Sequence, residues 1–309
     1  MARVKPSEVQ AIVDRRRPAA WEAAYARRLP ASGPHRTARR PRRLLVVGGG
    51  PAGVAAATAG ARVGYSVILA ESTDRLGGQL VLAGSSAARR TLWQRWLGWA
   101  HTELQSRAVD VRMNTTVKAE DCSGYDRVVI ATGARAGHPV RVPGRAVTLD
   151  AWTAIARPSP LIGSVLVLDR EGEWSALDAA EILATHGYAV TLATASETPG
   201  HWLRRCEQDA FRTRLTALGV RVLPRQELVI PSATSPAVIR HVHSGRTHPL
   251  DSRLGAIVVA AARAPESHLW SRLRGRPGIV RVGDAVAPRT LEDAIIDGTR
   301  SVTGSMCTV

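Results

Sequence analysis

Cysteine is scarce in this chain of 309 residues, which has only Cys122, Cys206 and Cys307. These residues are far apart in the sequence, so the chain has no Cys-x-x-Cys redox pair. Three thiolates are also too few for a four-cysteine iron–sulfur cluster or for a disulfide framework. We therefore expect a cytoplasmic protein held together by an apolar core, for which this length is sufficient.

Long apolar segments are missing as well. Arg3 and Lys5 are not followed by an apolar stretch, which argues against a secretory signal. The uncharged run from Leu44 to Ala61 is long enough to suggest a membrane span, but three successive glycines and Pro51 interrupt it. This run predicts a strand, a turn and a helix, and we expect no membrane span.

Lysine is almost absent, since only Lys5 and Lys118 occur among 42 basic residues and the others are arginine. A net charge of +16 is compatible with binding to phosphates. The arginine bias, together with the many alanines, indicates coding bias as much as selection for a polyanion. We expect no nucleic-acid partner.

Arginines crowd the first 43 residues, and we interpret residues 1–41 as a basic N-terminal arm and linker. Within it, Ser7 to Leu29 is interrupted by Pro18 and predicts two short helices, and Pro30 to Pro41 predicts a linker. Two interpretations of the arm stay open: a solvated tail, or a segment that docks on an acidic partner subunit.

The most informative segment runs from Leu44 to Glu71 and has the parts of a mononucleotide-binding βαβ unit in order. An apolar run is followed by Gly48-x-Gly50-x-x-Gly53, an Ala-rich helix and a second apolar run. Gly48 permits the tight turn, Gly50 lets the backbone approach a pyrophosphate, and Gly53 lets the helix pack closely on the strand. The helix N-terminus then faces the anion. The sequence therefore predicts an adenine-dinucleotide site.

Glu71 follows the second apolar run at about the spacing where a carboxylate accepts hydrogen bonds from the adenosine ribose. Such a carboxylate binds two ribose hydroxyls and repels a 2′-phosphate. It favours FAD, NAD or ADP over NADP at this first site.

Further segments of the same kind follow. Arg75 to Leu80 is a glycine-bearing loop just beyond the acid, Tyr125 to Gly133 predicts a buried strand that runs into a small-residue turn, and Val280 to Gly298 predicts a strand, a Gly-Asp turn and a helix. The spacing of apolar residues over Arg89 to Arg107 predicts another helix, with its tryptophans in the core.

Together these segments resemble the flavoproteins with two dinucleotide-binding domains, a superfamily that includes glutathione-reductase-like enzymes. The resemblance implies that the Ala-Thr-Gly turn closes over the FAD side and that Asp284 hydrogen-bonds the flavin ribitol. The motifs and the resemblance indicate these cofactor-binding residues: Gly48, Gly50, Pro51, Ala52, Gly53, Glu71, Arg75, Gly78, Gln79, Val117, Ala131, Thr132, Gly133, Gly283 and Asp284.

A closer resemblance lies in DREGEWSALDAAEILATHGYAVTLAT, RAPESHLWSRLR and VGDAVAPRTLEDAIIDGTR. These segments are similar to the C-terminal half of trimethylamine dehydrogenase and 2,4-dienoyl-CoA reductase relatives, and the likeness covers about residues 42–303. Those proteins join an Old Yellow Enzyme-like FMN barrel and a [4Fe-4S] cluster to a tandem pair of nucleotide-binding domains. This chain lacks the cluster cysteines and the length for a barrel. The resemblance therefore implies a separate barrel-type partner subunit.

The predicted fold class is α/β, with two Rossmann-like dinucleotide-binding domains, the second inserted in the first. The predicted boundaries are 42–160 for the first part of the FAD-binding domain, 161–276 for an NAD(P)-binding-like domain, and 277–309 for the second part of the FAD-binding domain.

The middle domain departs from the nucleotide-binding pattern. The strand Val165 to Leu168 is followed by Asp169 to Ala176, which keeps only Gly172 of the glycine fingerprint. Two acids and a tryptophan at this turn would repel or block a pyrophosphate. Binding of NAD(P)H and a merely structural domain both stay open.

The cofactor performs most of the chemistry in this fold, so we nominate no catalytic side chain and no metal site. We expect His201 to be a surface histidine and Cys206 a bystander. Asp178 and Glu181 lie three residues apart on one helix face, and we expect an exposed pair.

The predicted function is that of an FAD-binding electron-transfer subunit of an oxidoreductase, acting with a separate barrel-type subunit. The alternative is a non-catalytic assembly subunit that holds ADP, or no nucleotide, at the first site. The Arg75 to Leu80 loop and Gly283-Asp284 would serve a ribitol chain, and they favour FAD.

Overall fold

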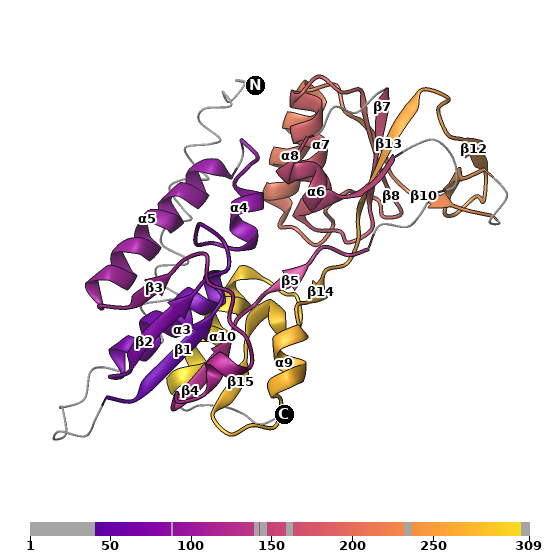
Figure 1. The fold of residues 1–309 in the computed structure, drawn as a ribbon. Helices are drawn as coiled ribbons and strands as arrows, with labels where there is room; N and C mark the ends of the chain where they lie inside the picture. The colour runs from indigo at the N-terminus through magenta and orange to yellow at the C-terminus, as the bar shows by residue number, and fades with distance from the viewer. Residues whose placement is uncertain are drawn as a thin grey trace. The chain divides into compact units, whose positions relative to one another are not determined.

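The computed structural model describes residues 41–87, 89–138, 142, 147–158, 163–231 and 236–303 (Figure 1). Residues 1–40, which carry the predicted basic arm, lie outside the described residues. The chain divides into two compact units. Of the described residues, those within 41–78, 96–134 and 265–303 form the first, and those within 79–95 and 135–264 form the second.

The first unit is built on a parallel sheet with the strand order β15-β4-β1-β2-β3. Its strands are β1 (Arg43–Val47), β2 (Ser66–Ala70), β3 (Asp110–Arg112), β4 (Arg127–Ile130) and β15 (Ile279–Arg281). Its other elements are α3 (Pro51–Arg62), η1 (Glu120–Cys122), α9 (His268–Leu273), η2 (Gly283–Ala285) and α10 (Leu291–Thr303). The helix α5 (Arg90–Ser106) begins in the second unit and continues into the first.

Both faces of this sheet are covered, which is why β1 is a continuous apolar run. Leu45 and Val47 pack with α9 residues such as Leu273 in one cluster. On the other face, a Cβ atom at Gly60 of α3 would lie 2.3 Å from a methyl group of Leu44, so glycine permits the close packing of helix and strand. Gly298 plays the same part between α10 and α3.

The second unit has a parallel sheet in the order β6-β13-β7-β8-β9 and an antiparallel sheet β10-β11-β12. The strands are β6 (Val147–Asp150), β7 (Ser164–Asp169), β8 (Val190–Thr194), β9 (Arg221–Leu223), β10 (Gln226–Val229), β11 (Val238–His241), β12 (Thr247–Pro249) and β13 (Leu254–Ala260). The helices are α4 (Gln79–Ala83), α6 (Ala151–Ala156), α7 (Trp174–Thr185) and α8 (Arg205–Ala217). The short strands β5 (Ala134–Arg135) and β14 (Ala264–Pro265) pair where the chain passes between the units.

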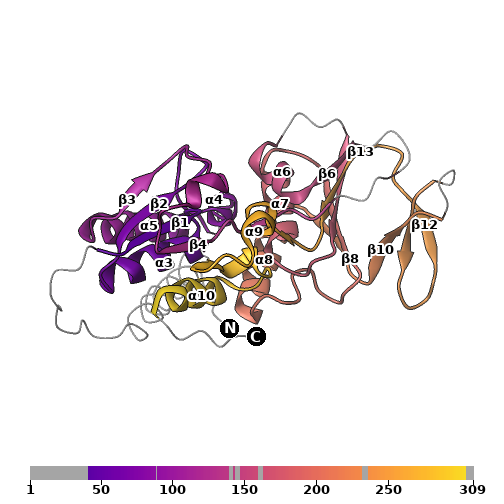
Figure 2. The same cartoon turned by 60° about the horizontal axis from the view of Figure 1, so that its bottom comes forward.

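The second sheet has α6, α7 and α8 on one side and the antiparallel sheet β10-β11-β12 on the other (Figure 2), and alternate residues of β7 pack toward the two sides. Val165 and Val167 pack with residues of α6, α7 and α8. Leu166 and Leu168 pack instead with Ile239 of β11, so the antiparallel sheet covers the other face. The parallel α/β architecture expected from the sequence is confirmed.

The compact units and the predicted domains divide the chain at different points. Residues 79–95 and 135–160, which the prediction placed in the first domain, cluster with the second unit, and 265–276 cluster with the first. Within α5, the tryptophan prediction holds for Trp96, which is buried with Ala100 and Leu104.

The expectation of an exposed Asp178–Glu181 pair is wrong. Asp178 is fully buried, and the guanidinium Nη1 of Arg89 donates to its Oδ2 over 2.6 Å. Glu181 is 4% exposed and accepts from Nε of Arg214 over 3.0 Å. The physical reason is that α7 is packed against the sheet on one side and against α6 and α8 on others, so it has no wide solvent-exposed face.

Among the residues that the structure describes, no helix is long and apolar enough to cross a membrane. The same residues contain no group of three or more His, Cys, Asp or Glu side chains arranged to hold a metal ion.

Candidate functional site

The turn between β1 and α3 has the backbone geometry that its glycines predict. Gly48 has a φ of +106°, and a Cβ there would lie 2.4 Å from the carbonyl oxygen of Ala131. A Cβ at Gly53 would lie 1.8 Å from the carbonyl oxygen of Gly48. Side chains at these two positions would collide with backbone, so glycine is required for the turn itself.

Gly50 has a different role. It is the N-cap residue of α3 with an ordinary φ of −74°, and a Cβ built on it would have no neighbour within 4 Å. The helix that begins at Pro51 has no side-chain cap and no acidic residue in its first turn. No side chain therefore caps this helix N-terminus, and its free amides and the positive end of its dipole can bind a phosphate.

Glu71 lies directly after β2, is 7% exposed and points at this turn. Its Oε2 accepts from the amide of Gly49 over 2.7 Å, and its Oε1 accepts from the amide and the hydroxyl of Thr73, each over 2.8 Å, and from the Ser72 hydroxyl over 3.2 Å. A carboxylate has about four acceptor positions, and Oε2 retains one of them. A ribose hydroxyl can use it.

The Ala131–Gly133 turn follows β4 and lies against the glycine turn, because Ala131 supplies the carbonyl that Gly48 approaches. The hydroxyl of Thr132 donates to the carbonyl of Glu266 over 2.8 Å, and the amide of Glu266 donates to the carbonyl of Gly133 over 2.9 Å. The turn is thus fixed by Glu266, which directly follows β14.

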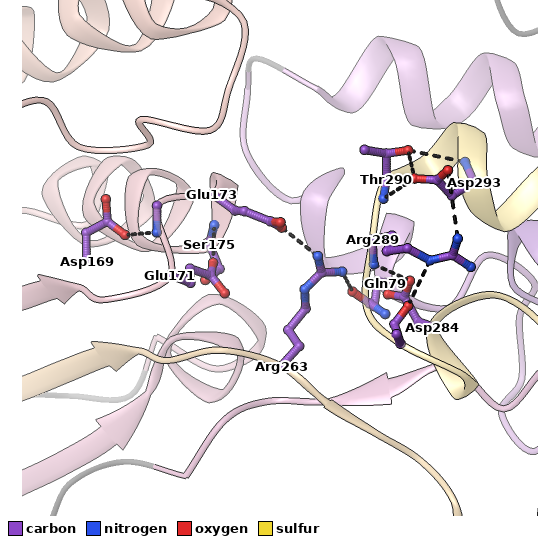
Figure 3. Close-up of polar contacts among 12 residues, drawn as sticks. Gln79, Asp169, Glu171, Glu173, Ser175, Arg263, Asp284, Arg289, Thr290 and Asp293 are labelled. Atoms are coloured by element: carbon purple, nitrogen blue, oxygen red, sulfur yellow. Dashed lines mark hydrogen bonds and ion pairs between the residues drawn. The ribbon is translucent and has the colours of Figure 1, made fainter. Parts of the chain in front are cut away.

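The Gly283–Asp284 turn follows β15 and packs on the start of α3. A Cβ at Gly283, where φ is +60°, would lie 2.8 Å from the Cβ of Ala52. The amide of Gly283 donates to Asp297, which also pairs with Arg289, and the amide of Arg289 donates to Oδ1 of Asp284 over 3.0 Å (Figure 3).

The beginning of α10 stabilises the same region. Thr290 donates its amide and hydroxyl to Asp293, and the amide of Asp293 donates to the Thr290 hydroxyl over 3.2 Å (Figure 3). This is a capping box, and it fixes the helix that carries Asp297.

The carboxyl ends of β1, β2, β4 and β15 therefore bring together most of the predicted residues of the first unit: Gly48, Gly50, Pro51, Ala52, Gly53, Glu71, Ala131, Thr132, Gly133, Gly283 and Asp284. A ligand in an open α/β sheet binds at this edge. A Cβ at Gly78 would lie 3.5 Å from the Cα of Gly50, which brings Gly78 to the same turn.

Three predicted residues lie elsewhere. Arg75 is exposed and pairs with Asp74, and its hydrogen bond lowers the pKa of the Asp74 carboxyl. Val117 is half-buried against the core cluster that contains Val128. Gln79 is the first residue of α4 in the second unit, where its side-chain oxygen accepts from Arg263 over 2.9 Å.

Sequence reasoning missed Gly49, Thr73 and Asp297. Gly49 is the second of three consecutive glycines, and a Cβ there would lie 2.6 Å from Leu76 and 3.2 Å from Glu71. The glycine triplet was the available signal for this position. No sequence signal marks Thr73 and Asp297, because their role depends on hydrogen bonds formed only in the fold.

Comparison with known proteins finds relatives of the kind that the sequence resembles. The FAD dependent oxidoreductase family matches residues 44–140. The chain is 29% identical over 289 residues to a probable N-methylproline demethylase of Rhizobium meliloti and 29% identical over 299 residues to a multifunctional alkene reductase/demethylase OYE of Caballeronia cordobensis. Residues 44–140 therefore match an FAD-dependent oxidoreductase domain. The resemblance to trimethylamine dehydrogenase and Old Yellow Enzyme-like relatives is confirmed.

Further relatives agree. An NADH oxidase of Thermoanaerobacter brockii is 28% identical over 266 residues and matches 83% of this chain. The histamine dehydrogenase structure from Rhizobium sp. 4-9 superimposes with a TM-score of 0.77 at 26% identity and covers 89% of this chain.

The chain spans less than half the length of these relatives. The alignments cover 84% and 85% of this chain but 42% and 44% of the first two relatives, 40% of the NADH oxidase and 46% of the histamine dehydrogenase.

Proposed function

We propose that this chain is the FAD-binding electron-transfer part of an oxidoreductase and that it works with a separate barrel-type subunit. The observation that carries the proposal is the open space at Gly50, at the uncapped N-terminus of α3 and beside the buried carboxylate of Glu71. Within this proposal, the two units are the tandem dinucleotide-binding domains expected from the sequence, and the cytoplasmic location stays a prediction.

The residues of the first unit fit the adenosine diphosphate part of FAD. The N-terminus of α3 binds the pyrophosphate, since Gly50 leaves its backbone approachable and no side chain caps the helix. Glu71 binds the ribose through the remaining acceptor position of Oε2. The negative charge of this buried carboxylate also repels a 2′-phosphate.

The flavin end of the site depends on the Gly283–Asp284 turn. The contacts of Asp284 with the amide of Arg289, and of Asp297 with the amide of Gly283, fix the carboxylate of Asp284 before any ligand binds. A ribitol hydroxyl then meets a preorganised acceptor. When bound, FAD supplies the transfer of electrons as hydride or singly, and these side chains supply its position.

The proposed partner is consistent with the share of the relatives that this chain matches. The chain matches under half of each relative described above. Reduced flavin needs an acceptor at short range. A second chain that carries the barrel supplies this acceptor in the proposal.

The nucleotide released from the purified chain tests the proposal. The chain is denatured, and the supernatant is separated by chromatography and followed by flavin absorbance and fluorescence. We expect close to one FAD per chain. Release of ADP in place of FAD would establish the competing function of an assembly subunit, and release of neither from protein purified in the presence of FAD would overturn the first-site assignment.

A further inference from the structure

The turn between β7 and α7 in the second unit occupies the same place in its sheet as the glycine turn of the first unit. Both follow the central strand of a parallel five-stranded sheet and lead into a helix of twelve residues. The first turn is open at Gly50, as described above. The second is filled by three groups of the chain itself.

The first group is the carboxylate of Glu171. Its Oε1 accepts from the amide of Ser175, the second residue of α7, over 3.2 Å and from the hydroxyl of Ser175 (Figure 3). An amide in the first turn of a helix is the donor that a bound pyrophosphate would use. Here an internal anion takes it.

The second group is the imidazole of His201. A Cβ at Gly172 would lie 2.2 Å from Cε1 and 2.5 Å from Nδ1 of His201, so the ring covers the one glycine that survives from the fingerprint. Asp169, which is 4% exposed, fixes this arrangement by accepting from the amide of Gly172 and the amide of Gly200, each over 2.7 Å. The amide of Trp202 also donates to the carbonyl of Gly172 over 2.9 Å.

The third group is Glu173, the N-cap residue of α7 and the counterpart of Gly50. Its carboxylate pairs with Nη2 of Arg263 over 2.6 Å, and this arginine side chain is 7% exposed (Figure 3). The nearby cation is therefore already paired with a carboxylate. A dinucleotide pyrophosphate would bring two further negative charges to a turn that holds Glu171 and Glu173.

We propose that Glu171 is a built-in substitute for the pyrophosphate and that, together with His201 over Gly172, it excludes pyridine dinucleotides from the second unit. Glu171 is thus a specificity-determining residue. Because neither NADH nor NADPH binds at this turn, electrons reach the chain from another donor. One relative is named an NADH oxidase, and we therefore argue the exclusion from these residues and not from the fold. The exclusion of pyridine dinucleotides does not depend on FAD at the first site.

The full chain at pH 8 tests this inference by chemical rescue. Burial raises the pKa of Glu171 to about 7, so its carboxylate is ionised at this pH. Glu171→Ala leaves the α7 amide and the Ser175 hydroxyl without their acceptor. Inorganic pyrophosphate at ten times its dissociation constant should then raise the folding equilibrium constant of this variant about 11-fold and that of the wild type much less.

Asp150→Ala is the matched control. Asp150 caps α6 in the same way, accepting from the amide of Thr153 over 2.9 Å and from its hydroxyl over 2.6 Å, but these bonds are exposed to solvent. This variant should lose stability without rescue by pyrophosphate. Equal rescue of both variants, or none of Glu171→Ala, would overturn the role of Glu171.

Titration with NADH tests the exclusion itself. Gly50→Val serves as the background because it closes the first site, and the stacked Trp152 and Trp174 provide a fluorescence signal at the second. We expect no saturable change up to millimolar NADH in this background, and a saturable change when Glu171→Ala and His201→Ala are added. Saturable binding to Gly50→Val alone, or none to the triple variant, contradicts the inference while leaving the FAD proposal intact.

Discussion

Two carboxylates at corresponding turns have opposite effects on the neighbouring helix. Glu71 accepts from Gly49, which precedes α3, and so leaves the N-terminus of that helix open to a ligand. Glu171 accepts from Ser175, which lies inside the first turn of α7, and so satisfies the helix from within. The difference between a binding site and a filled site therefore depends on which amide the carboxylate accepts from.

Gly50→Val tests the first site. The backbone at Gly50 is extended and a Cβ there has no neighbour within 4 Å, so we expect the chain to fold with valine at a capping cost of roughly 1 kcal/mol. Its methyl groups occupy the space of the pyrophosphate, and we expect FAD binding to fall more than about tenfold, or 1.4 kcal/mol. Equilibrium binding measures the loss.

Gly98→Val is the control for Gly50→Val. Gly98 lies on the exposed side of α5, and a Cβ there also has no neighbour within 4 Å. This variant should keep its FAD. A folded Gly50→Val chain with unchanged FAD stoichiometry would remove the first-site assignment.

Glu171→Gln tests the electrostatics of the second turn. Burial raises the pKa of Glu171 from 4.5 to about 7, repulsion from Glu173 adds to the shift, and Ser175 and Arg263 oppose it. The folded chain therefore holds this proton more tightly than the unfolded chain. Stability contributed by the protonated form is fully present below about pH 4.5 and is lost as the pH rises to about 7.

The expected size of this effect is about 3 kcal/mol, because each pKa unit corresponds to about 1.4 kcal/mol. The measurement is the free energy of unfolding in urea at several pH values, compared between the wild type and Glu171→Gln. The variant should lack this slope between pH 4.5 and 7. Parallel curves would mean that Glu171 titrates normally.

At the scale of elements, the sequence predicted what local pattern encodes. The glycine spacing predicted the β1–α3 turn. The 3.6-residue period predicted a helix over 89–107, and the structure has α5 at Arg90–Ser106. The burial of Asp178 and Glu181 could not be foreseen, because their arginine partners Arg89 and Arg214 lie 89 and 33 residues away in the chain. Pairing over such separations leaves no periodic signal.

The Arg89–Asp178 pair attaches the segment that precedes α5 to α7. Arg89 also lies over the ring of Phe211, 5.0 Å from its centroid, and Arg214 lies over the same ring at 4.6 Å. Removing Arg89 leaves the Asp178 carboxylate buried without its cation. We expect Arg89→Ala to cost about 3–5 kcal/mol of unfolding free energy at pH 8.

A pH series distinguishes this charge effect from lost packing. Burial raises the pKa of Asp178 to about 6 even with Arg89 opposing the shift, so removal of Arg89 raises it further. The cost of Arg89→Ala should therefore shrink at pH 5, where Asp178 is protonated. Arg205→Ala, which removes an 82% exposed side chain paired with Asp209, should cost under about 0.5 kcal/mol at either pH. A pH-independent loss for Arg89→Ala would assign the effect to packing alone.

At the scale of the whole molecule, the two parallel sheets have different proposed functions. The first unit has an open turn with a ribose-binding acid, and the second has a closed turn of the same topology. The apolar strands made the parallel sheets predictable from the sequence. Which turn is open depends on single residues such as Gly50 and Glu171, and therefore on contacts formed after folding.

The predicted basic arm bears on how this chain meets its proposed partner. Residues 1–40 lie outside the described residues, so the argument rests on their sequence, which is rich in arginine and carries the apolar residues Val9, Ile12 and Val13. A cationic segment with apolar anchors is suited to an acidic protein surface. Deletion of residues 1–40 should leave FAD binding intact and weaken the complex with the barrel subunit.

The loss should depend on salt. Attraction between arginines and carboxylates is screened over about 10 Å at 0.1 M ionic strength, so the wild-type complex should weaken as salt rises while the truncated complex responds less. Sedimentation or co-purification at two salt concentrations measures both effects, and the released flavin reports whether the first site survived truncation. A truncated chain that keeps its partner at full stoichiometry with unaltered salt sensitivity would make the arm a solvated tail, and the docking surface would then have to lie on the two folded units.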